Sequence, residues 1–203
     1  MRPATTRQPA VFLDKDGTLV ENVPYNVNPA RVRLMRGAAE GVAALHAAGF
    51  VLVVVSNQPG VSLGLFEAGA LEGVRHRLRE LLERAGAPLS GFYFCPHAAG
   101  PDGRPLCRCR KPAPGLLLQA ARELYLDLGR SWMVGDILDD VEAGRAAGCR
   151  TVLVDSGGET EWRLSSARVP HAMAADLKSA AEVVIAGMER VRSWAPRALE
   201  AGR

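Results

Sequence analysis

The chain has 203 residues, with 25 lysines and arginines against 22 aspartates and glutamates, so its formal net charge is only +3 at pH 7. This length suggests a single domain that can bury a sizeable core. The small net charge argues against nucleic acid as a partner. The longest apolar run, residues 50–55, is too short to span a bilayer, and residues 1–10 lack the apolar core of a signal peptide. We therefore expect a cytoplasmic protein that binds neither membranes nor nucleic acid.

Short apolar runs alternate with amphipathic stretches along the chain. The runs predict strands at residues 10–13, 50–55, 91–94, 131–134 and 151–154 and a weaker one near 171–174, and the amphipathic stretches predict helices at residues 38–48, 67–85, 114–127, 138–147 and 176–191. This alternation predicts an α/β fold, a Rossmann-like parallel sheet with right-handed crossovers and helices on both faces. Residues 1–191 would form one domain, and residues 192–203 a mobile C-terminal tail.

The first predicted strand ends at two acids, Asp14 and Asp16, which are followed by Gly17. Side chains alternate along an extended chain, so carboxylates two residues apart point the same way. Such a pair favours a cation between them, and Mg²⁺ prefers hard oxygen ligands. A carboxylate beside bound Mg²⁺ can attack phosphorus. A plain turn at Gly17 is the alternative, and the motif alone does not decide between the two.

Polar residues stand beside three other predicted elements. They are Ser56 and Asn57 after the strand at 50–55, Arg110 and Lys111 before the helix at 114–127, and Asp136 after the strand at 131–134. Because the carboxyl ends of parallel strands share one edge, where ligands bind, these groups are expected to converge with the two acids. Acids, a hydroxyl and a lysine supply the nucleophile, metal site and phosphoryl-oxygen donors that phosphoryl transfer needs.

Three of the four cysteines lie close to a histidine in a loop rich in glycine and proline. The four residues are Cys95, His97, Cys107 and Cys109. Three thiolates and an imidazole match a closed tetrahedral Zn²⁺ site, which would be structural. A disulfide and ordinary cysteines near a turn are the alternatives, and a cytosolic setting disfavours the disulfide. The segment 95–109 is therefore predicted to be a zinc-bound loop that positions Arg110 and Lys111. Cys149 is expected to be a core thiol.

Four motifs together resemble the haloacid dehalogenase (HAD) superfamily of phosphatases, over roughly residues 10–160. They are Asp14-Lys-Asp16-Gly-Thr, Ser56-Asn57-Gln58, Arg110-Lys111-Pro and Gly135-Asp136 with Asp140. The stretches Phe94-Cys-Pro-His97 and Cys107-Arg-Cys-Arg-Lys-Pro112 resemble one branch of it. That branch holds the D-glycero-D-manno-heptose 1,7-bisphosphate phosphatases and the histidinol-phosphate phosphatases.

This resemblance implies a role for each residue. Asp14 would attack phosphorus to form an aspartyl-phosphate, and Asp16 would be the general acid and base. Mg²⁺ would be held by Asp14, by the backbone carbonyl of Asp16 and by Asp136, with Asp140 facing the metal through water. Donors to the substrate would be Ser56, the backbone amide of Asn57, Arg110 and Lys111, of which Lys111 would also offset the charge of Asp14.

The expected activity is hydrolysis of a small phosphorylated metabolite, most specifically D-glycero-D-manno-heptose 1,7-bisphosphate, by a monomer. Histidinol phosphate or another sugar phosphate is the alternative substrate. Leu63, Leu65 and Ile137 stand where this branch often has cations, so substrate identity stays open. No separate cap domain fits between the motifs. A phosphate-accepting receiver domain and an inactive zinc-stabilised interaction module are the non-enzyme alternatives, although a receiver lacks the second acid of Asp14-x-Asp16.

Overall fold

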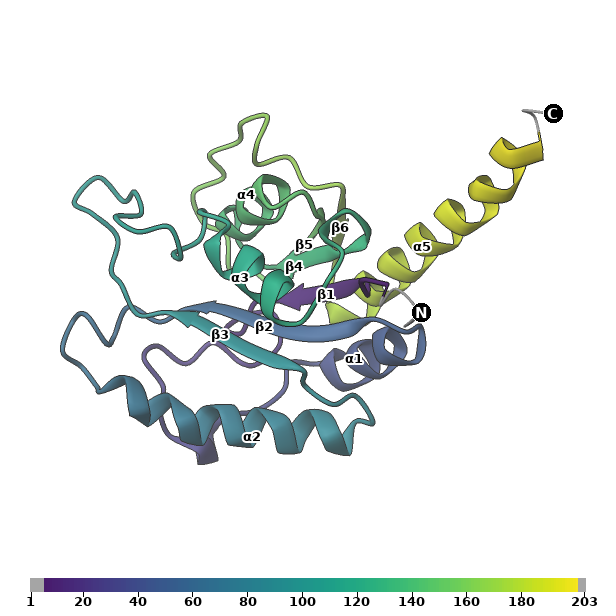
Figure 1. Cartoon of the computed structure of the whole chain (residues 1–203). Coiled ribbons are helices and arrows are strands. Elements are labelled where there is room, and N and C mark those ends of the chain that lie inside the picture. The colour runs from purple at the N-terminus through teal and green to yellow at the C-terminus, as the bar shows by residue number, and fades with distance from the viewer. Residues whose placement is uncertain (1–5, 201–203) are drawn as a thin grey trace.

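The structure is a computed structural model that describes residues 6–200, with side chains described as far as residue 188. A six-stranded sheet forms its centre, with strands in the order β3-β2-β1-β4-β5-β6 and every neighbouring pair parallel (Figure 1). The strands are β1 Ala10–Leu13, β2 Val51–Asn57, β3 Gly91–Cys95, β4 Trp132–Gly135, β5 Arg150–Val154 and β6 Ala172–Ala174. The predicted parallel sheet is thereby confirmed.

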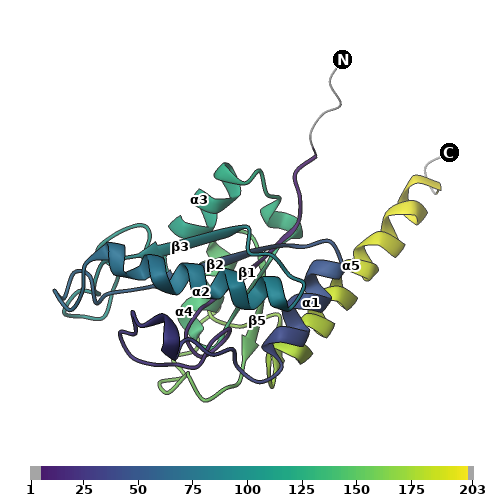
Figure 2. The same cartoon turned by 90° about the horizontal axis from the view of Figure 1, so that it is seen from below.

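Five α-helices cover the two faces of the sheet. They are α1 Ala38–Ala47, α2 Leu71–Arg84, α3 Gly115–Glu123, α4 Leu138–Ala146 and α5 Leu177–Glu200. Helices α1, α2 and α5 share one apolar cluster with one face of the sheet, and α3 and α4 share another with the opposite face. Figure 2, seen from below, shows the face that carries α1 and α2. The fold is therefore a three-layer α/β/α arrangement, as the alternating pattern predicted.

The central strands are apolar on both sides because both sides are covered. In β1, Val11 and Leu13 belong to the cluster beneath α1, α2 and α5, whereas Phe12 belongs to the cluster beneath α3 and α4. All four residues of this strand are fully buried. Such continuous apolar runs are typical of strands in parallel sheets. This explains why the strands were recognisable as short apolar runs.

Helix ends differ from the predicted bounds by more than one residue in three places. Residues 68–70 form a 3₁₀ turn, so α2 begins later than predicted. Helix α3 ends at Glu123, and Tyr125 adopts a left-handed conformation with a φ of 58°. Helix α5 continues to Glu200 and so includes most of the segment predicted as a tail. Residues 201–203 lie outside the described residues, and mobility of the tail stays a prediction.

Two connections at the carboxyl edge of the sheet lead into α1 and α2. Residues 14–37 link β1 to α1, and residues 58–70 link β2 to α2. Within residues 6–200 neither connection forms a separate cap domain, in agreement with the prediction. In the same part of the chain, no helix combines the length and apolarity needed to cross a membrane.

Candidate active site

The predicted site residues are positioned by the ends of three neighbouring strands. Asp14 directly follows β1, Ser56 lies near the end of β2, and Asp136 directly follows β4. Because β1 lies between β2 and β4 and all three run in parallel, these positions lie at one edge of the sheet (Figure 1). Lys111 reaches the same edge from the loop before α3, since its ammonium group contacts Asp14. Ligands bind at this edge in open α/β sheets.

Lys111 is buried at the centre of the site, with only 1% of its surface exposed. Its Nζ contacts Asp14 Oδ1, lies 2.6 Å from Asp140 Oδ1 and donates to the carbonyl of Val55 at 3.0 Å. Burial lowers the pKa of this lysine, but the carboxylates of Asp14 and Asp140 outweigh burial and raise the pKa above its usual value. Lys111 is therefore a fixed positive charge beside two acids.

Three carboxylates gather around this lysine. Asp14, Asp136 and Asp140 each place an oxygen within 4.8 Å of the others. Burial, together with the charge of Asp14, raises the pKa of Asp136 to about 6. Burial also raises the pKa of Asp140 to about 8, although Lys111 opposes the shift. Three acids facing one cation leave excess negative charge, and hard oxygen ligands in this number fit a magnesium ion.

Asp136 is held in a narrow space by its surroundings. Thr18 donates its hydroxyl to Asp136 Oδ1 at 3.0 Å. A Cβ atom at Gly17 or at Gly158 would lie 2.2 Å or 1.8 Å from Asp136 Oδ2. Gly17 also has a φ of +83°, which side chains rarely adopt. Glycine is thus required at both positions for the carboxylate to fit.

Asp140 lies closer to the cluster than the sequence predicted. It was expected to face the metal through water, whereas its carboxylate is one of the three converging acids and pairs with Lys111. Its Oδ2 also accepts from the backbone nitrogen of Ile137 at 3.4 Å, at the start of α4. The spacing of four residues from Asp136 was the signal for this placement, because α4 begins between them.

Asp16 lies outside the three-acid cluster and has its own partners. Lys15 Nζ lies 2.6 Å from Asp16 Oδ1, and Gln58 Nε2 donates to Asp16 Oδ2 at 3.1 Å. Burial raises the pKa of Asp16. Lys15 and Gln58 are both buried, and neither was predicted to belong to the site. Both residues stand inside motifs that carry the resemblance, Asp14-Lys-Asp16-Gly-Thr and Ser56-Asn57-Gln58, and this was the signal that could have identified them.

The side chain of Asn57 holds the backbone of Lys111. Asn57 Nδ2 donates to the carbonyl of Lys111 at 3.0 Å, and the backbone nitrogen of Lys111 donates to Asn57 Oδ1 at 3.0 Å. Arg110 donates to the carbonyl of His97 at 3.1 Å. The side chain of Arg110, predicted to lie at the substrate, and that of Asn57, of which only the backbone amide was predicted to do so, therefore make contacts that fix the loop before α3.

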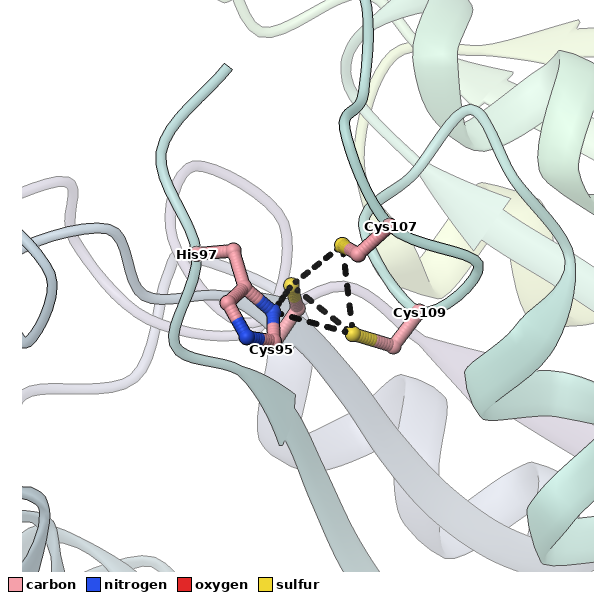
Figure 3. A group of neighbouring side chains, drawn as sticks. All are labelled: Cys95, His97, Cys107 and Cys109. Carbon is pink, nitrogen blue, oxygen red and sulfur yellow. Dashed lines mark hydrogen bonds between the residues drawn. The ribbon is translucent and has the colours of Figure 1, made fainter. Parts of the chain in front are cut away.

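The predicted zinc ligands come together as one cluster (Figure 3). The Sγ atom of Cys95 lies 3.2 Å from that of Cys109 and 3.6 Å from that of Cys107, and the Sγ atoms of Cys107 and Cys109 are 3.3 Å apart. His97 Nδ1 lies 3.5 Å from Cys95 Sγ and 3.4 Å from Cys109 Sγ. Four ligand atoms that bind one zinc ion at the corners of a tetrahedron would lie about 3.7 Å from one another.

The cluster contains free cysteines rather than a disulfide. A bonded sulfur pair would be separated by about 2.0 Å, well below the distances found here. Burial acts to raise the pKa of Cys107, but hydrogen bonds, first among them that from the backbone nitrogen of Arg110, lower it to about 7. These four residues can therefore hold a soft divalent metal, and as a complete ligand set they leave no open position.

A parallel α/β/α sheet with acids, a lysine and a hydroxyl at its carboxyl edge defines the class of HAD-like hydrolases. The family model with the description HAD-hydrolase-like matches residues 108–180. The chain belongs to the HAD family that contains the D-glycero-D-manno-heptose-1,7-bisphosphate 7-phosphatases. This family membership rests on curated relatives that the chain matches over nearly their whole length.

Two such relatives and one crystal structure illustrate the match. The D-glycero-beta-D-manno-heptose-1,7-bisphosphate 7-phosphatase of Yersinia pestis is 38% identical over 86% of this chain and 100% of its own length. The corresponding enzyme of Thermosynechococcus vestitus is also 38% identical, over 86% of this chain and 94% of its own. The D,D-heptose 1,7-bisphosphate phosphatase of B. bronchiseptica, complexed with magnesium and phosphate, has a TM-score of 0.73 and 29% identity, over 88% of this chain and 99% of that chain.

Proposed function

We propose that this protein is a Mg²⁺-dependent phosphatase that removes the 7-phosphate of D-glycero-D-manno-heptose 1,7-bisphosphate. The convergence of Asp14, Asp136, Asp140 and Lys111 at the carboxyl edge of the sheet carries the proposal. The specific substrate is supported by the relatives that share 38% of their residues with the chain. A cytoplasmic location and a monomeric state remain predictions from the sequence.

In this proposal each group at the edge of the sheet has a stated role. Asp14 attacks the phosphorus, and Asp16 donates a proton to the leaving oxygen and later accepts one from water. Ser56 and the backbone amide of Asn57 donate to the phosphoryl oxygens, and Lys111 places its positive charge beside Asp14. Asp14, Asp136 and the backbone carbonyl of Asp16 would hold Mg²⁺, as would Asp140. When bound, that ion supplies positive charge that stabilises the phosphoryl group during transfer.

A substrate panel tests the proposal. With Mg²⁺ present, kcat/KM should be higher for the heptose bisphosphate than for histidinol phosphate and other sugar phosphates by at least about tenfold, because discrimination depends on contacts beyond the transferred group. The leucines at positions 63 and 65 are about half exposed on the loop after β2, so they are the first residues to examine if another substrate is preferred. Higher kcat/KM for histidinol phosphate would contradict the proposed substrate. Failure to turn over even p-nitrophenyl phosphate would favour a receiver or an inactive module.

Asp16→Asn should impair leaving-group protonation more than any other step. The asparagine keeps the backbone carbonyl proposed for the metal, but it cannot donate the proton. We expect kcat/KM to fall by about 10²- to 10⁴-fold for alkyl phosphates, whose leaving oxygens need that proton. The loss for p-nitrophenyl phosphate should be much smaller, because its leaving group departs without protonation. Steady-state kinetics on both substrates measures this difference, and equal losses would count against an acid role for Asp16.

The cysteine cluster is proposed to hold one structural zinc ion per chain. Cys107→Ser should abolish zinc binding, reduce stability and weaken substrate binding together, because metal binding is coupled to local folding and this loop leads into Arg110 and Lys111. Cys149→Ser is the matched control, since Cys149 is a buried cysteine outside the cluster. Metal analysis should find about one zinc in the wild type and in the control. Activity should still need added Mg²⁺.

Two results would contradict the zinc proposal. One is wild-type protein without zinc when it is prepared without a chelator. The other is a disulfide between Cys95 and either Cys107 or Cys109 in a reduced preparation.

A further inference from the structure

Gln58 connects two groups of the proposed active site through a single amide nitrogen. Its Nε2 lies 3.1 Å from Asp16 Oδ2 and 2.9 Å from Ser56 Oγ. An amide NH₂ group has two hydrogens, so it can donate to both oxygens at once. Gln58 is 4% exposed and Ser56 is 1% exposed, so water does not readily replace either contact.

The backbone around Gln58 is fixed from two directions. The backbone nitrogen of Gln58 donates to the carbonyl of Cys95 at 2.8 Å, which ties it to the cysteine cluster. The side chain of the preceding residue, Asn57, makes two hydrogen bonds with the backbone of Lys111. The side chain of Gln58 therefore starts from a well-defined position.

The two oxygens of Asp16 have different partners. Oδ1 pairs with Lys15, its neighbour in sequence, and Oδ2 accepts from Gln58, which lies 42 positions away. The contact with Lys15 restrains Asp16 only relative to its own segment of the chain. The contact with Gln58 relates Asp16 to Ser56, on the neighbouring strand. Gln58 thus links the carboxylate of Asp16 to the hydroxyl of Ser56 through one amide nitrogen.

We infer that Gln58 is a positioning residue that aligns the acid/base Asp16 with a phosphoryl group bound at Ser56. The inference rests on the proposed function, because it takes the roles of Asp16 and Ser56 from there. Without the amide donor, Asp16 keeps its contact with Lys15 but loses its restraint toward Ser56. Small losses of alignment strongly reduce proton transfer to a reacting group.

Gln58→Met tests this inference, because methionine has a similar length and no donor. We expect kcat/KM for an alkyl phosphate to fall by about 10- to 100-fold, and kcat/KM for p-nitrophenyl phosphate to fall by less than about threefold. Ser62→Ala is the control in the same loop, since Ser62 Oγ accepts from the backbone nitrogen of Ala98 and donates to the carbonyl of Pro59, and so serves the loop instead of Asp16. It should change kcat/KM for both substrates by the same factor.

The double variant Asp16→Asn/Gln58→Met shows whether Gln58→Met acts by misplacing Asp16 or by damaging the active site as a whole. If Gln58 acts through Asp16, adding Gln58→Met to Asp16→Asn should not increase the preference for p-nitrophenyl phosphate further. A uniform loss on both substrates in Gln58→Met, or a selective loss that persists in the double variant, would overturn the inference. If circular dichroism shows that Gln58→Met is unfolded, Gln58→Leu gives the same comparison, because leucine also lacks a donor and carries no charge. An inactive wild type would instead refute the proposed function.

Discussion

Replacing Asp14 with asparagine is expected to reduce turnover to background while the fold survives. The amide keeps the size of the side chain but removes the charge that attack on phosphorus requires. It also removes one of the three carboxylates of the acidic cluster. Since both the proposed nucleophile and a proposed metal ligand are lost, kcat should fall by at least about a thousandfold. Steady-state kinetics with saturating Mg²⁺, together with circular dichroism, measures the effect.

Asp139→Asn is the matched control for this variant. Asp139 lies next to Asp140 in sequence, but its carboxylate pairs with Arg168 at 2.5 Å and does not belong to the acidic cluster. Its turnover should stay close to that of the wild type. A folded Asp14→Asn protein that retains activity would remove Asp14 from the mechanism.

Of these substitutions, Lys111→Met should cause the largest decrease in the free energy of unfolding of the metal-free protein. The ammonium group of Lys111 is buried against Asp14 and Asp140, and its removal leaves two buried carboxylates without that charge. Removing one partner of a buried ion pair costs about 3–5 kcal/mol. Added Mg²⁺ should recover part of the loss, because a bound cation again offsets the acids. Activity should fall as well, since a charge beside the nucleophile is lost.

Urea unfolding with and without Mg²⁺ measures this prediction. Lys178→Met is the control, because Lys178 is an exposed lysine at the start of α5. Its free energy of unfolding should change by no more than about 0.5 kcal/mol. If Lys111→Met unfolds like Lys178→Met and remains active, then Lys111 does not balance the acidic cluster.

The sheet was predictable because its strands are buried on both faces and therefore form continuous apolar runs. In β2 every residue from Leu52 to Val55 is fully buried, so the run stands out from the amphipathic helices beside it. The order of the strands did not follow from such runs. It depends on which apolar faces pack together, and the same runs are compatible with other orders.

The acids were predictable because they stand at strand ends, and the cysteine cluster because the chain has only four cysteines and three of them lie close to one histidine. The buried contacts of Lys15 and Gln58 were not, since a lysine or glutamine in a loop is usually exposed to solvent. They become buried only when the segments after β1 and β2 close over each other. The extent of α5 was missed for a related reason, because helical pattern alone locates helix ends poorly.

The measurement that tests the proposed chemistry most directly is rapid acid quenching of the protein during turnover, followed by mass analysis of its peptides. With Mg²⁺ and D-glycero-D-manno-heptose 1,7-bisphosphate, we predict a transient phosphate on the peptide that contains Asp14. Asp16→Asn should allow this phosphate to accumulate with p-nitrophenyl phosphate, because the base that activates water is absent. Turnover without any phosphate on Asp14, or with phosphate on another residue, would contradict the proposed function.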